Sequence, residues 1–155
     1  MLDIVSDDTS NLLALLDGRV MVQLRYGKLT LEALELAARR IIPVLEAEPR
    51  SVGAIAIING DAGVTLPEVQ ARQKLLIGGM LRRPNAWMTT VMFGETIQAT
   101  AMRAVGRVLM IGARNIRHAK DVHEGVTWLG EKLGDITPLQ LNDAINSLEA
   151  KRKKP

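Results

Sequence analysis

Residues 52–69 read Val52-Gly-Ala-Ile-Ala-Ile-Ile-Asn-Gly-Asp-Ala-Gly-Val-Thr-Leu-Pro-Glu-Val69, and this stretch decides the fold class. It begins with an apolar run rich in isoleucine, which is too short for an independent helix and is typical of a central strand buried on both faces. A glycine-containing turn follows at residues 59–63. Thr65-Leu-Pro-Glu68 then has the spacing of a capping box with proline in the first turn, so we expect a helix that runs to about Leu81. A buried strand, a turn and a capped helix in succession predict an α/β fold.

The segment before this unit predicts a hairpin and a helix. Apolar runs at residues 11–16 and 20–26 flank Asp17-Gly18, and an Asp-Gly pair between apolar runs is a strong hairpin signal. The second run alternates between two faces, as expected for a strand with one better-buried face. Thr30 is expected to cap the following helix, which Pro43 should kink or shorten.

The segment after residue 81 predicts two further strand–helix units. Residues 87–93 form a β-type run, and a helix is expected over about residues 97–111. Residues 115–120 are a weaker strand candidate. Asp121-Val-His-Glu124 has capping-box spacing for a helix that Gly134 should end, and Thr137 opens a short helix with one apolar face.

Together these segments predict one α/β domain, in which a β-hairpin is followed by alternating strand–helix units. We expect a mixed, mostly parallel sheet of about five strands with helices packed on it. A chain of 155 residues is long enough to bury a single hydrophobic core. The domain is expected to span residues 1–134, and residues 135–155 are expected to form an appendage made of a short helix and a basic tail.

Composition excludes several classes of protein. The chain has no cysteine, which excludes a disulfide framework, a thiolate nucleophile and cysteine-ligated metals. The tail Lys151-Arg-Lys-Lys154 supplies four of the twenty basic residues, and the other sixteen face seventeen acidic residues, so no nucleic-acid-binding face is expected. The tail itself is either a solvated terminus or an electrostatic tether to an anionic partner. The chain start is not a secretory signal, and no apolar run approaches the roughly 18 residues of a membrane span. These features predict a cytoplasmic protein without integral membrane association.

The turn after the central strand is the candidate site. Its residues are Asn59, Gly60, Asp61, Ala62, Gly63 and Thr65. A helix N-terminus can hold an anion, but this turn lacks both the Gly-Lys-Ser/Thr of a phosphate loop and the full dinucleotide fingerprint. Asp61 would itself occupy the positive end of the helix, and the Thr65 hydroxyl is expected to cap it. The turn is therefore either purely structural or a site for a ligand or a protein partner.

Other polar residues give weaker indications. His118 and His123 are the only histidines, and a metal site needs three or four convergent ligands, so neither a metal nor a cofactor is predicted. Arg103, Arg107 and Arg114 form either a basic stripe for an acidic partner or the solvated side of a helix. The methionines suit a packed core or, alternatively, the lining of a small apolar cavity.

Three segments and the element order carry a resemblance to a known family. The segments are Ala54-Ile-Ala-Ile-Ile58, Arg103-Ala-Val-Gly-Arg-Val-Leu109 and Val122-His-Glu-Gly-Val-Thr-Trp-Leu129. With the predicted order of strands and helices, they resemble the STAS domain of bacterial anti-sigma-factor antagonists, over about residues 11–133. The likeness is greatest to the divergent SpoIIAA-like branch, which shares features with lipid-binding CRAL-TRIO domains.

The resemblance implies a regulatory domain without enzymatic activity. The antagonists of this family bind a kinase-type partner, and phosphorylation of a serine in an Asp-Ser-Ser-Gly turn switches that binding off. The matching turn here is Gly60-Asp-Ala-Gly63, in which Asp61 and Gly63 fit the pattern but Ala62 stands at the phosphoacceptor position. The resemblance therefore implies a member that binds constitutively or is used differently.

The sequence thus predicts a non-enzymatic protein-interaction domain. Its partner surface would include residues 59–65 and the first turns of the following helix. The alternative is a carrier of a small apolar ligand or lipid in a Met- and Ala-lined pocket beside the sheet, and an enzyme acting through Asp61 and arginines is the least favoured function. A homodimer through exposed apolar helix faces is a further arrangement that the sequence allows.

Overall fold

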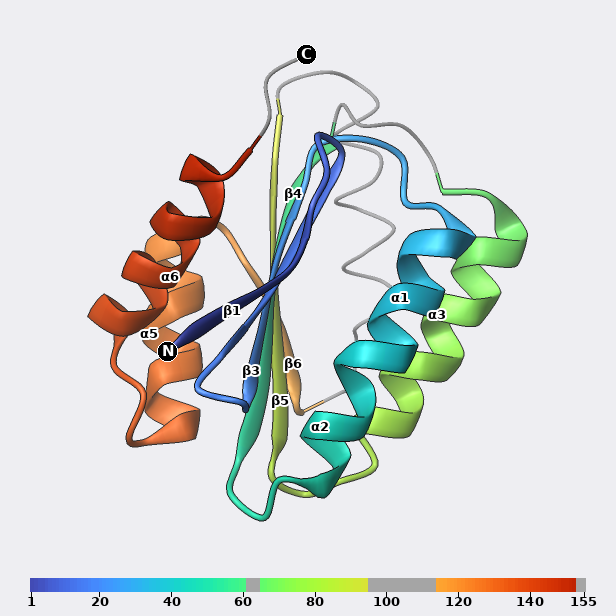
Figure 1. The fold of residues 1–155 in the computed structure, drawn as a ribbon. Coiled ribbons are helices and arrows are strands. Elements are labelled where there is room, and N and C mark those ends of the chain that lie inside the picture. Colours follow the sequence, from blue (N-terminus) through green and yellow to red (C-terminus); the bar gives the residue numbers. More distant parts are fainter. Residues whose placement is uncertain (61–64, 95–113, 153–155) are drawn as a thin grey trace.

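A computed structural model gives the structure of residues 1–60, 65–94 and 114–152, which form a six-stranded sheet (Figure 1). The strands lie side by side in sequence order, and β1, β2 and β3 pair antiparallel whereas β3 to β6 pair parallel. Their bounds are β1 (Leu2–Asp7), β2 (Asn11–Leu16), β3 (Val20–Arg25), β4 (Val52–Asn59), β5 (Ala86–Phe93) and β6 (Ile116–Ala119). The expected mixed sheet of an α/β fold is confirmed, and the strand count is six because β1 was not predicted.

Helices cover both faces of the sheet (Figure 1). In the described residues they are α1 (Leu31–Arg40), α2 (Ile42–Ala47), α3 (Pro67–Met80), α5 (Val122–Leu133) and α6 (Pro138–Ala150). α1, α2 and α3 lie on one face, and α5 and α6 lie on the other. The connections from β3 to β4 and from β4 to β5 step across the sheet in the same direction, so right-handed crossovers place their helices on the same face. The opposite face is left for α5 and α6.

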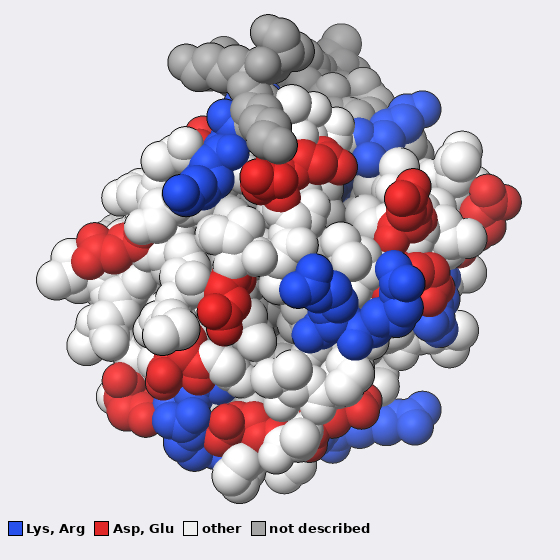
Figure 2. Space-filling model, viewed as in Figure 1, with Lys and Arg blue, Asp and Glu red and all other residues white. Residues whose placement is uncertain are grey.

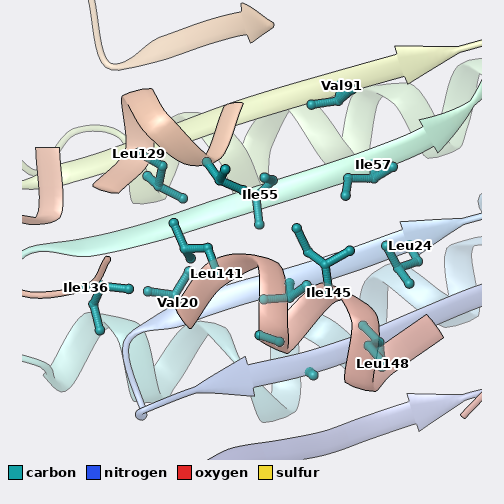
Figure 3. Packing of buried hydrophobic residues seen from close by; sticks show 14 of the residues in the cluster. Val20, Leu24, Ile55, Ile57, Val91, Leu129, Ile136, Leu141, Ile145 and Leu148 are labelled. Atoms are coloured by element: carbon teal, nitrogen blue, oxygen red, sulfur yellow. The ribbon is translucent and has the colours of Figure 1, made fainter. Parts of the chain in front are cut away.

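Each face of the sheet has its own hydrophobic core. On the α5–α6 face, Val20 and Ile55 from the strands meet Leu129 and Leu141 from the helices (Figure 3). On the other face, strand residues pack with Leu45 and with residues of α1 and α3. Residues 52–58 of β4 are all buried, which confirms the central strand predicted from the apolar run.

The C-terminal helix belongs to this core, which differs from the appendage expected for residues 135–155. Leu141, Ile145 and Leu148 of α6 are buried in the cluster shown in Figure 3. α6 contacts β1, β2 and β3, whereas α5 contacts β4, β5 and β6. Because α5 covers only the parallel half of the sheet, the antiparallel half would expose its apolar side chains to water without α6.

Turn and cap signals in the first 50 residues are confirmed. Asp17 and Gly18 have φ angles of 53° and 67°, as in the two-residue hairpin turns that fit the twist of paired strands. The Thr30 side chain accepts a hydrogen bond from the backbone N–H of Ala33 and caps α1. Pro43 stands in the first turn of α2, so the single helix expected here is divided in two.

Candidate functional site

The candidate turn lies at the carboxyl end of the central parallel strands. Asn59 is the last residue of β4 and is half-buried, Gly60 follows it and is buried, and Thr65 lies two residues before α3. The remaining predicted site residues, Asp61, Ala62 and Gly63, lie outside the described residues. In an open α/β sheet this edge is where ligands usually bind.

A buried arginine ties the end of β3 to the segment that leads into α3. Arg25 is only 4% exposed. Its Nη2 donates to the Thr65 hydroxyl at 3.2 Å, and its Nε donates to the Gly27 carbonyl oxygen at 3.1 Å. Burial lowers the pKa of the Arg25 guanidinium, but an arginine starts so high that it stays charged at neutral pH. The contact therefore fixes Thr65 against the sheet, next to the carboxyl end of β4.

The predicted capping box at Thr65 does not form. The N-cap of α3 is Leu66, with no side-chain cap, and Pro67 occupies the first helical turn. A proline ring disfavours the helical region for the residue before it, and Leu66 is extended, so it is not the first helical residue that the capping box requires. The Thr65 hydroxyl is instead an acceptor for Arg25, and the Thr65 carbonyl oxygen accepts from Gln70 Nε2 at 3.0 Å. The helix reaches Met80, close to the predicted end.

Two exposed apolar residues flank the turn, and sequence reasoning missed both. Phe93 is the last residue of β5, pairs in register with Asn59 and is 43% exposed. Leu66 is 53% exposed just before α3. Phe93 could have been found from its place as the single phenylalanine at the end of a predicted strand. Arg25 could have been found in the same way, because it ends the neighbouring strand.

Among the described residues, the two histidines and Arg114 do not gather into one site. His118 Nδ1 lies 3.0 Å from the Thr90 hydroxyl, and His123 stands in the first turn of α5. The described residues contain no group of three or more side chains suited to a metal ion. Arg103 and Arg107 lie outside the described residues, and Arg114 is exposed.

A small apolar cavity lies between the sheet and helices α1 and α3, apart from the turn. Its volume is about 60 Å³. Met21, Met80 and Met88 are among its lining residues, and Gln23 and Gln73 are its polar ones. Ligand pockets for drug-sized molecules are roughly 300–1,000 Å³. The structure therefore contains a methionine-lined cavity of the kind that the alternative function requires. This cavity is much smaller than a pocket for a drug-sized ligand.

Charge on the face seen in Figure 2 is mixed in sign. Lys and Arg side chains are interspersed with Asp and Glu across it. Ion pairs in the described residues include Arg72 with Glu35 at 2.7 Å and Arg50 with Glu48 at 2.8 Å. The basic tail also begins beside the domain, since the Arg152 guanidinium lies 3.5 Å from the ring centre of Tyr26.

No protein-family model, curated protein or solved structure matches this chain. The resemblance to STAS domains accordingly rests on the segments and the element order given above. Among the helices of the described residues, none combines the length and the apolar content needed to cross a membrane.

Proposed function

We propose that this protein is a non-enzymatic, STAS-like regulatory domain that docks a kinase-type protein partner through the turn at residues 59–65. One observation carries the proposal: Phe93, 43% exposed, stands beside Asn59 at the carboxyl end of two adjacent parallel strands. Aromatic side chains are enriched in protein interfaces and often dominate their binding energy. The exposed Leu66 extends this apolar surface to the start of α3.

The anchored ends of the turn support a preformed docking surface. Asn59 ends a strand that is paired on both sides, and Thr65 is held by the buried Arg25. A surface whose borders are fixed before binding loses less conformational entropy on association, so more of the contact energy appears as affinity.

Constitutive binding is favoured over a phosphorylation switch. Ala62 stands at the position that carries the phosphoacceptor serine in the family and has no hydroxyl. The nearest downstream hydroxyl is that of Thr65, which is 7% exposed and already accepts a hydrogen bond from Arg25. A kinase would have to break that contact to reach it.

Site-specific photo-crosslinking in the cells that make this protein tests the proposal. A photoreactive phenylalanine analogue at position 93 should yield one protein adduct, and Asp61→Ala should remove it. The matched control carries the analogue in place of Leu139, which is 69% exposed on α6, far from the turn in the sequence. Equal labelling from positions 93 and 139, or an adduct that Asp61→Ala leaves unchanged, would contradict the proposal.

The carrier function makes a different prediction for the same protein. A carrier would retain a lipid or other apolar molecule through purification, and native mass spectrometry would record its mass on the folded chain. Under the docking proposal we expect the bare chain mass, and the described cavity between the sheet and helices α1 and α3, about 60 Å³, is smaller than an acyl chain needs. A bound lipid mass, together with no adduct from position 93, would favour the carrier.

A further inference from the structure

The outer face of α3 carries an exposed apolar strip. Leu75, in the middle of the helix, is 69% exposed. At 100° per residue, Ala71, Gly78 and Gly79 fall on the same side as Leu75, and all of them are exposed. This strip lies on the side of α3 away from the sheet, whereas Val69 and Met80 are its buried residues.

The two glycines of this strip have no explanation within the described chain. Neither has a positive φ angle, so no turn requires them. A Cβ atom built at Gly78 or Gly79 meets no described atom within 4 Å, so no close packing inside the domain requires them either. Glycine is the least favourable helix residue apart from proline, and both glycines stand in the last turn of α3. The space beside these glycines would let a second helix approach α3 closely.

The charges at the two ends of the strip identify the partner as a second copy of this chain. Glu68 and Arg82 are both exposed, and they stand seven residues before and seven residues after Leu75. Within the described residues neither of them forms an ion pair. At about 1.5 Å per residue, Glu68 lies about 10 Å from Leu75 along the helix axis, and Arg82 stands in the turn just after Leu81, the C-cap of α3. An antiparallel copy centred on Leu75 brings Glu68 against Arg82 and Ala71 against Gly79, whereas a parallel copy brings like charges together.

We propose that α3 mediates a two-fold symmetric homodimer, in which antiparallel α3 helices cross at Leu75 and the glycines let the backbones approach. The interface is isologous, so each pair of contacts occurs twice. One helix pair buries less than the roughly 1,600 Å² of a standard interface, so we expect a weak, concentration-dependent dimer. The proposal is independent of docking at the 59–65 turn, because it uses other residues.

Analytical ultracentrifugation of the full chain from about 1 to about 300 µM tests the dimer by mass action. The wild type should pass from monomer to dimer over this range. Leu75→Glu places two like charges at the two-fold axis and should leave only monomer. Leu139→Glu is the matched control, because Leu139 is equally exposed at 69% but lies on α6, and it should dimerise like the wild type.

A charge exchange tests the antiparallel register. Glu68→Arg should weaken the dimer at least tenfold, and the double variant Glu68→Arg/Arg82→Glu should restore it. Gly79→Leu should raise the melting temperature of the monomer, since leucine favours helix more than glycine, and yet weaken the dimer. A wild type that stays monomeric at 300 µM, equal effects at positions 75 and 139, or no rescue by the double variant would overturn the proposal.

Discussion

At the scale of single residues, a buried arginine joins distant parts of the chain. Arg19 follows the hairpin turn between β2 and β3 and is 1% exposed. Its Nη1 donates to the Asp135 carboxylate at 2.7 Å, and its Nε donates to the Ser51 carbonyl oxygen at 2.9 Å. These bonds tie the hairpin to the start of β4 and to the loop between α5 and α6.

This ion pair predicts a pH dependence of stability. The hydrogen bond from Arg19 holds the pKa of the Asp135 carboxyl below its usual value. A carboxyl with a lowered folded-state pKa stabilises the fold above its unfolded pKa of about 4, and this stabilisation is lost as the pH falls through the folded value. We expect Asp135→Asn to lower the urea midpoint at pH 7 and to approach the wild type as the pH falls through the folded-state pKa of Asp135. In the control variant Glu131→Gln, which removes an exposed charge on α5, the difference in urea midpoint from the wild type should not change with pH in this way.

Loss of the hydroxyl should change the unfolding free energy differently at Thr65 and at Thr89. Thr65→Val removes the acceptor of a buried, charged donor, Arg25, and should cost about 1–3 kcal/mol of unfolding free energy. Thr89 is fully buried in β5, and its hydroxyl has no hydrogen-bond partner among the described residues. Thr89→Val keeps the shape and removes an unsatisfied polar group, so it should leave stability equal or raise it by about 1 kcal/mol. Chemical denaturation of both variants provides the comparison, and equal losses would contradict the assigned hydrogen bond.

At the scale of elements, α6 offers a direct test of its place in the core. Leu148→Ala deletes a fully buried side chain and should cost about 2–5 kcal/mol through lost burial and a residual cavity. Leu139→Ala on the same helix removes a side chain that is 69% exposed, so it should change stability by less than about 0.5 kcal/mol. Urea unfolding of the two variants separates a core helix from an appendage, because an appendage would make the two losses equal.

The sequence predicted the elements with strong local signals and missed those that depend on neighbours. The apolar run of β4 and the Asp17-Gly18 turn are such signals, and both are confirmed. β1 was missed because it is an edge strand with exposed Asp3 and Ile4, and because its register shifts near Val5, which hides the two-residue alternation. Local reasoning could not place α6 either, since its burial depends on which part of the sheet α5 leaves uncovered.

The sequence predicted where the candidate turn lies in the fold, and the use of this turn as a site stays a prediction. Its place after the central strand follows from the fold, and Asn59 and Thr65 do flank the turn. The role of Thr65 was wrong because two local rules compete there, and the constraint that Pro67 imposes on Leu66 prevails over the capping-box spacing. The Arg25 contact with Thr65 joins residues forty positions apart, so no local pattern indicates it.

At the scale of the whole molecule, protection from hydrogen exchange should decrease from the middle of the sheet to its edges. β4 is paired on both sides and covered on both faces, so its amides should exchange only through global unfolding. β1 pairs on one side only and has no buried residue, so its amides should exchange through local opening. Mass-spectrometric exchange of peptides from the two strands measures the difference. Equal protection would mean that the edge is covered, for example by another chain.

The sequential strand order also has a consequence during synthesis. Each strand pairs with the strand made just before it, so the sheet can grow as the chain leaves the ribosome. The part of the apolar face that α6 covers nevertheless stays exposed until Leu148 has been made. At about 5–20 residues per second, the interval between the completion of β4 and the synthesis of Leu148 is roughly 4–18 seconds. During that interval the nascent chain exposes apolar surface. Ribosome-associated chaperones protect surfaces of this kind from aggregation.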